Sequence, residues 1–231
     1  MTKGETGRSF VIRIAAESRT EAILEFHKKH LTEHLWPRTL KQIKELANDE
    51  RLYEVVEIRG AEEILVGLCY ITQGQEPEPP TAERDEFGGV YTSDDCRGYG
   101  IASALGKIAI SNHFAWDPPR GRLIAHVHEA NELPRRVLQE QLGFVQNGQE
   151  IPPAEVVPEN MKRNKDGQVV GHLFEFQRKT LLKFADWVEN FSGTAEGPAG
   201  KSWLRIELPL ITTYREAAVT ALREQGKKKI A

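Results

Sequence analysis

The chain has 231 residues, 39% of them hydrophobic and 28% charged, so it can bury a core and is not of the intrinsically disordered class. Its 31 basic and 34 acidic residues give a formal net charge of −3, which weighs against nucleic acid as a partner. The two cysteines, Cys69 and Cys96, are too few for a disulfide framework and point to a reducing compartment. No apolar run is long enough for a signal peptide or a membrane-spanning helix. We therefore expect a cytoplasmic protein that does not engage a membrane.

The first half of the chain alternates strand and helix patterns, which is typical of α/β proteins. Alternating, β-rich segments predict four strands, at residues 9–15, 51–60, 63–74 and 87–93. Ser18 and Glu21 resemble a capping box that opens a helix to about His30, and Pro37 fits the first turn of a second helix that ends near Ala47. The acidic, proline-rich segment 75–86 is expected to be a solvated loop.

A third predicted helix begins at about Gly98 and ends before the Pro-Pro pair at 118–119. A strand at 123–130 and a short helix ending at a C-cap, Gly143, follow it. Two more strands are predicted at 144–149 and 168–177, separated by a proline-rich, partly basic loop.

The pattern changes after residue 178, so we divide the chain into a domain of residues 1–178 and an extension of residues 179–231. The extension is expected to contain a helix, a flexible loop, a strand and a helix, at residues 180–191, 192–200, 202–208 and 212–226. It could cover a cleft, extend the sheet or form the interface of a homodimer, and the sequence does not decide among these roles.

The segment CRGYGIASALGK, residues 96–107, has the composition of a phosphate-binding loop. It is not a Walker A loop, because Ile101 stands where the first glycine belongs and Ile108 replaces the hydroxyl residue that serves Mg²⁺. It is a poor dinucleotide fingerprint, because Ser103 replaces the third glycine. The remaining pattern is R-x-x-G-x-A, in which small residues let a pyrophosphate approach the free N–H groups at a helix start.

The stretch VYTSDDCRGYGIASAL resembles motif A of the GNAT superfamily, the acyl-CoA-dependent N-acyltransferases. Downstream, HVHEANELPRRVLQEQLGF is similar to that family's motif B, at the family's usual distance. The resemblance implies a mixed, mostly antiparallel twisted sheet with two splayed parallel central strands, flanked by helices. It also implies an N-acetyltransferase that uses acetyl-CoA or another acyl-CoA.

The resemblance also implies which residues bind the cofactor. Backbone groups of Val90, Tyr91 and Thr92 would bind the pantetheine arm. Asn131 would contact the cofactor, cap the following helix, or do both. N–H groups of the loop would hold the pyrophosphate, from Arg97, Gly98, Tyr99, Gly100, Ile101 and Ala102. No metal is expected, because two histidines alone are too few for a zinc site.

The catalytic residues are less well defined by the sequence. An alkylammonium acceptor must lose a proton before it attacks a thioester. Glu86 is a candidate base, or a solvated residue at the end of an acidic loop. His126 and His128 share one face of a strand and are candidate bases or packed side chains. Many members of the family carry a tyrosine where Gln139 stands, and the helix between Asn131 and Gly143 is one residue longer here.

The acceptor is expected at residues 27–37 and in the loop at 150–168. His27, His30 and His34 fall on one helix face, beside Trp36, and form either an acceptor pocket or an amphipathic face. The acceptor is a small-molecule or protein amine, attacked directly in a ternary complex. The alternative is a module with the same fold that binds CoA without turnover.

Overall fold

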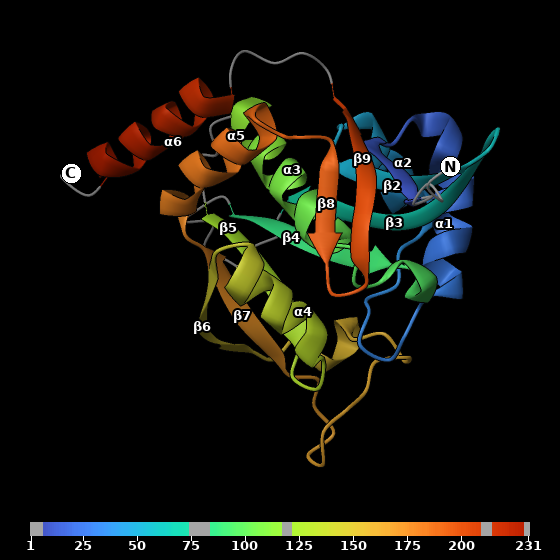
Figure 1. Cartoon of the computed structure of the whole chain (residues 1–231). Coiled ribbons are helices and arrows are strands. Elements are labelled where there is room, and N and C mark those ends of the chain that lie inside the picture. The colour runs from blue at the N-terminus through green and yellow to red at the C-terminus, as the bar shows by residue number, and fades with distance from the viewer. Residues whose placement is uncertain (1–6, 74–83, 117–121, 209–213, 229–231) are drawn as a thin grey trace.

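The computed structural model describes residues 7–73, 84–116, 122–208 and 214–228. Within them, one nine-stranded sheet has the order β6-β7-β5-β4-β3-β2-β1-β9-β8 (Figure 1). The strands are β1 (Ser9–Ile14), β2 (Leu52–Arg59), β3 (Glu62–Gln73), β4 (Arg84–Thr92), β5 (Arg122–His128), β6 (Phe144–Glu150), β7 (Gly171–Phe176), β8 (Thr194–Gly197) and β9 (Gly200–Glu207). The α-helices are α1 (Thr20–Lys29), α2 (Leu40–Asn48), α3 (Ile101–Trp116), α4 (Glu132–Arg136), α5 (Leu181–Glu189) and α6 (Tyr214–Lys228).

The sheet is mixed, as the sequence predicts. The pairs β4–β5 and β1–β9 are parallel, and the other neighbouring strands are antiparallel. The predicted fold class is therefore confirmed. No helix in the described part of the chain has the length and apolar character needed to cross a membrane.

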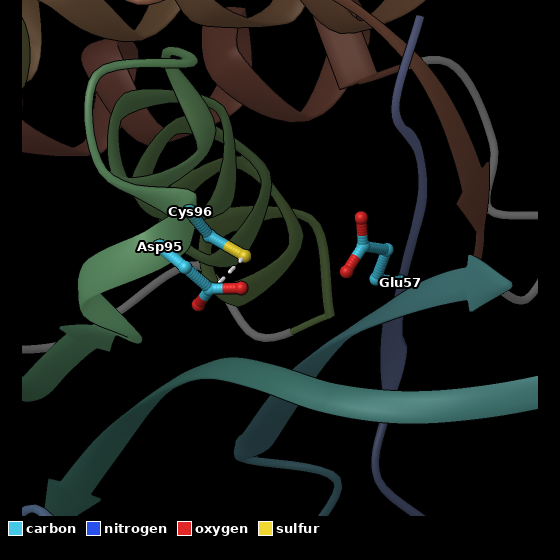
Figure 2. Close-up of side chains that lie close together, drawn as sticks. All are labelled: Glu57, Asp95 and Cys96. Carbon is cyan, nitrogen blue, oxygen red and sulfur yellow. Dashed lines mark hydrogen bonds between the residues drawn. The ribbon is translucent and has the colours of Figure 1, made fainter. Parts of the chain in front are cut away.

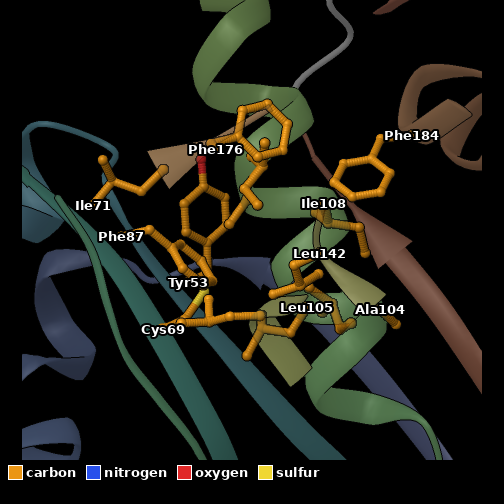
Figure 3. Packing of buried hydrophobic residues seen from close by; sticks show 14 of the residues in the cluster. Tyr53, Cys69, Ile71, Phe87, Ala104, Leu105, Ile108, Leu142, Phe176 and Phe184 are labelled. Atoms are coloured by element: carbon orange, nitrogen blue, oxygen red, sulfur yellow. The ribbon is translucent and has the colours of Figure 1, made fainter. Parts of the chain in front are cut away.

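The main core lies between the sheet and α3. Leu105 and Ile108 of α3 are fully buried and belong to one cluster with Tyr53 and Phe87 of the sheet (Figure 3). Phe184 of α5 belongs to the same cluster, together with further buried residues of the C-terminal segment: Leu181, Ala185, Ala195, Leu204, Ala218 and Ala221. The C-terminal segment thus shares its core with the rest of the chain.

The caps of the first two helices differ from the prediction. Ser18 lies in a 3₁₀ turn before α1, and α1 has no side-chain capping bond at its start. The capping box is instead formed by Thr39 and Gln42, which bond reciprocally at the start of α2. Because that box fixes the helix start at Leu40, Pro37 lies before the helix rather than in its first turn.

The predicted flexible loop at 192–200 is wrong. Residues Thr194–Gly197 form β8, which pairs with β9 in a hairpin. β9 in turn runs parallel to β1, so the C-terminal segment extends the sheet. The local composition, rich in glycine and proline, hides a strand whose pairing partners lie elsewhere in the sequence.

Candidate functional site

The central feature of the sheet is a split between β4 and β5. Their parallel ladder has three pairs and ends at Glu86 and Ile124, although both strands continue. Gly89 causes a bulge at this point: its φ is +61°, and a Cβ there would lie 2.0 Å from the ring of Tyr70. Beyond the split, the edge of β4 that faces β5 has no strand partner in the described structure, so its backbone groups are open to a ligand.

A cavity of about 720 Å³ continues from this split to the start of α3. It is lined by β4 and β5, by the loop before α3, by α4 and by residues of the β8–β9 hairpin. The predicted cofactor residues that line it are Val90, Tyr91, Thr92, Arg97, Gly98, Gly100, Ile101, Ala102 and Asn131. Tyr99 does not line it, and its ring instead packs against Arg8 and Phe10.

The loop before α3 has the geometry of an anion cradle. Gly98 and Gly100 have φ values of +82° and +77°, which only glycine adopts readily. The helix begins at Ile101, three residues later than predicted, because these two conformations cannot belong to a helix. No described group accepts a hydrogen bond from the N–H of Ile101, Ala102 or Ser103, so these N–H groups remain free for a ligand. The N–H of Arg97, predicted to hold the pyrophosphate, instead donates to the carbonyl of Asp94 at 3.3 Å.

The turn that leads into this loop is held by a partly buried ion cluster. Glu57, Asp95 and Cys96 lie close enough together to suggest metal ligands (Figure 2). The Arg8 guanidinium contacts all three: it bonds to Glu57 at 2.5 and 2.8 Å, to the Asp95 carboxylate at 3.2 Å and to the Cys96 sulfur at 3.0 Å. These bonds lower the pKa of Glu57. The cluster already holds its cation, and its effect is to tie β1 and β2 to the loop.

The candidate bases Glu86 and His126 meet at the split. Glu86 is paired within β4, so the predicted loop at 75–86 is wrong for residues 84–86. His126 contacts Glu86 through Nδ1 at 3.1 Å and Glu150 of β6 through Nε2 at 2.9 Å. Burial disfavours the imidazolium, but the two carboxylates outweigh burial and raise the pKa of His126 above its ordinary 6.5. Arg84 bonds to Glu150 at 3.1 Å and helps to lower the pKa of that carboxyl. His126 lines the cavity, whereas Glu86 lies one hydrogen bond behind it.

His128 faces the same cavity but both of its ring nitrogens have backbone partners. Nε2 lies 2.8 Å from the carbonyl oxygen of Lys162, and Nδ1 accepts from the N–H of Ala130 at 3.1 Å. His128 therefore joins β5 to the loop before β7. Asn131 precedes α4 without a side-chain capping bond, so its side chain is available to the cavity.

The extra residue predicted between Asn131 and Gly143 is absorbed in a π-helical turn. α4 continues as this turn over Val137–Gln141, where the N–H of Leu142 donates to the carbonyl of Val137 at 3.0 Å. Gly143 then ends the helix with φ +69°, as predicted for a C-cap. Gln139 is exposed and does not line the cavity, whereas Leu138 does.

The two predicted acceptor segments meet above the split. The N–H of Lys162 donates to the carbonyl of Glu33, and the Asn160 side chain donates to the carbonyls of Thr32 and Leu35. Trp36 packs against a small cluster formed by Val157, Met161 and Val169. The two segments thus contact each other, and the first of them lines the cavity through Thr32, His34 and Leu35.

The three histidines of the first acceptor segment have different surroundings. His34 stacks on His128 with ring centroids 4.7 Å apart, and burial lowers its pKa. Nδ1 of His30 lies 2.6 Å from the hydroxyl of Tyr91, and both His34 and Tyr91 line the cavity. His27 belongs to α1, is buried and lies outside the cavity lining, and His34 lies beyond the end of α1, so the three histidines do not share a helix face.

Sequence reasoning missed several residues of this site. The sequence does not single out Arg84 and Glu150, because their side-chain contact joins β4 and β6, which are 66 residues apart in sequence and are not neighbours in the sheet. The sequence pattern also does not single out Lys107, Trp187 or the β8–β9 hairpin, which line the cavity. The available signal is the four-residue spacing of Ser103 and Lys107, which puts both on one side of α3.

Comparison with known proteins gives a likeness in structure only. No family model matches the sequence, and no curated protein matches it. Arabidopsis thaliana NAA60 in complex with a bisubstrate analogue is similar in structure, with TM-score 0.53 and 13% identity over 73% of this chain and 97% of the other.

Two further solved structures are similar to the same degree. The NatC complex bound to Gag peptide and CoA gives TM-score 0.54 and 17% identity, over 72% of this chain and 97% of the matched chain. The acetyltransferase of the GNAT family from Streptococcus pneumoniae gives TM-score 0.53 and 17% identity, over 72% and 98%. At these identities the likeness establishes the fold.

Proposed function

We propose that this chain, which has the fold of the GNAT acetyltransferases, is an acetyl-CoA-dependent N-acetyltransferase acting on a primary amine. The observation that carries the proposal is the continuity of three features in one cavity: the split between β4 and β5, the free N–H groups at the start of α3, and His126 with its two carboxylates. The similar structures support it, since they include an acetyltransferase of the GNAT family, the NatC complex bound to Gag peptide and CoA, and NAA60 in complex with a bisubstrate analogue.

The chain has a suitable binding place for two parts of acyl-CoA, the pyrophosphate and the pantetheine arm. The N–H groups of Ile101, Ala102 and Ser103 bind the pyrophosphate, and the positive end of the α3 dipole favours its charge. The open edge of β4 from Val90 to Thr92 binds the extended pantetheine arm. The residues present therefore fit the molecule, which supplies the acyl group as a thioester.

His126 is the proposed base. When neutral, it leaves a cluster of Glu86, Glu150 and Arg84 with one net negative charge, which attracts the ammonium form of the acceptor. His126 then takes a proton from that ammonium and frees the amine for direct attack. Glu86 and Glu150 are positioning residues, because they orient the imidazole and strengthen it as a base. His128 remains a candidate from the sequence, but its backbone partners favour a role in fixing the loop before β7 to β5.

The proposal is tested by turnover with a panel of amines. Thiol release from acetyl-CoA is followed spectrophotometrically, and the acetylated amine is identified by mass spectrometry. We expect amine-dependent thiol release, with a reduction of about 10²-fold or more in His126→Asn, since general-base catalysis contributes 10²–10⁴-fold. Binding of acetyl-CoA without turnover by any amine of the panel would instead favour the alternative, a CoA-binding module.

A further inference from the structure

The cavity continues beyond the loop before α3 into a groove. Residues of the C-terminal segment line one side of this groove. Lys107 of α3 forms part of its floor, and Val137, Gln141 and Trp187 line it from the helices on either side. The β8–β9 hairpin supplies further lining through Thr194, Ala195, Glu196, Gly197 and Pro198. In Figure 1 the hairpin lies beside α3, close to α4.

The hairpin turn is seated directly on the phosphate loop. The N–H of Ala199 donates to the carbonyl of Gly98 at 2.8 Å. The contact is so close that a Cβ on Gly197 would lie 2.2 Å from the Gly98 oxygen, and a Cβ on Gly100 would lie 2.7 Å from the Glu196 oxygen. The groove beyond the loop therefore has a fixed outer wall made by the hairpin.

Lys107 is a cation without an anionic partner in this groove. It makes no ion pair with any described residue, and its ammonium lies 4.9 Å from the ring centre of Trp187. Burial lowers its pKa, and no neighbouring carboxylate offsets this effect. Glu196, the acidic residue among the described lining, is exposed on the hairpin and does not pair with it. A half-buried ammonium in this setting gains free energy when an anion binds beside it.

The position of Lys107 indicates which anion would bind beside its ammonium group. Lys107 follows Ser103, whose N–H is free, by four residues, or about one helical turn, so it lies about 6 Å farther along the same side of α3. A pyrophosphate at the helix start would leave Lys107 within reach of a further phosphate on the same nucleotide. The proposed ligand carries such a group, because CoA has a phosphate on the ribose 3′ oxygen.

We propose that Lys107, walled by Trp187 and the β8–β9 hairpin, binds the 3′-phosphate of acyl-CoA and selects CoA over its dephosphorylated form. This inference rests on the proposed function and assigns the C-terminal segment a part in recognising the nucleotide half. The aromatic ring holds the lysine side chain along the groove, so less of its conformational freedom is lost on binding.

The test is a calorimetric measurement of the dissociation constants of CoA and dephospho-CoA, which differ by this one phosphate. We expect the full-length protein to bind CoA about 10-fold more tightly than dephospho-CoA, the scale of one charge-assisted hydrogen bond. Lys107→Met should reduce the preference to within about twofold by weakening CoA alone, and Lys107→Arg should keep much of it. Lys183→Met, which removes an exposed lysine of α5, is the control for net charge and should change neither constant.

Three results would overturn the inference. Equal binding of the two ligands by the unmodified protein would contradict it without any variant. Equal weakening of both ligands in Lys107→Met would mean that the lysine binds the pyrophosphate or supports the fold, and the midpoint of thermal unfolding separates these two causes. Absence of binding by both ligands would overturn the proposed function as well, whereas the first two results leave the proposed function intact.

Discussion

The environment of His126 determines how activity should depend on pH. Its imidazole lies between the carboxylates of Glu86 and Glu150, at 3.1 and 2.9 Å, and together they raise its pKa above 6.5. A base must be neutral to accept a proton, so the raised pKa moves the active form to higher pH. The same contacts that make His126 a stronger base therefore shift its deprotonation to higher pH.

We expect kcat/KM to rise with pH through an inflection above 6.5 in the unmodified protein. Glu86→Gln removes one of the charges that stabilise the imidazolium, so the inflection should move to lower pH while the maximal rate falls. A pH profile of the two proteins at saturating acetyl-CoA measures both effects. An inflection that does not move in Glu86→Gln would mean that His126 is not the titrating base.

At the scale of elements, the β8–β9 hairpin is the part that the sequence concealed. Its first strand, Thr194–Gly197, lies in a segment rich in glycine and proline, and its pairing with β9 and β1 depends on distant residues. The loop before α3, in contrast, could be predicted in part, because small residues and free N–H groups at a helix start are local properties. Its positive φ values were not predicted, since the sequence pattern placed Gly98 in the helix.

The contact between the hairpin and the loop predicts the effect of Gly197→Val. The new side chain cannot fit, since even a Cβ would lie 2.2 Å from the Gly98 oxygen, so the hairpin must lift from the loop. Overpacking of this kind costs about 1–3 kcal/mol, and we expect acetyl-CoA binding to weaken by about 10-fold or more. Lys201→Ala, an exposed change on the same hairpin, should leave the affinity unchanged. Unchanged affinity in Gly197→Val would mean that the hairpin only extends the sheet.

At the scale of the whole molecule, the boundary that we place at residue 178 marks a change of sequence pattern, and residues on both sides of it share one core. The C-terminal segment contributes Leu181, Phe184, Leu204 and Ala221 to the cluster that contains Leu105 of α3. It also forms a parallel ladder with β1 through β9. The fold class could be predicted from the order of elements, but this shared core could not, because it depends on how α5 and α6 pack on α3.

We therefore expect the full chain to unfold in one cooperative transition. Far-ultraviolet circular dichroism and tryptophan fluorescence should give the same midpoint on heating. A chain that ends at residue 178 would expose the core residues now covered by α5 and β9, and we expect it to aggregate or to lose a cooperative transition. A soluble, cooperatively folded 1–178 fragment would contradict this expectation.

The central claim is that the free N–H groups at the start of α3 bind the pyrophosphate of acyl-CoA. Calorimetric titration of acetyl-CoA into the unmodified protein and Ala102→Glu tests it most directly. A glutamate in the first turn of α3 is compatible with the helix dipole, so the fold should survive, while its charge repels the phosphates. We predict binding to the unmodified protein and a loss of about 100-fold or more in Ala102→Glu, with Ala102→Ser close to the unmodified protein. No heat of binding at millimolar acetyl-CoA, or equal affinity in Ala102→Glu, would contradict the account.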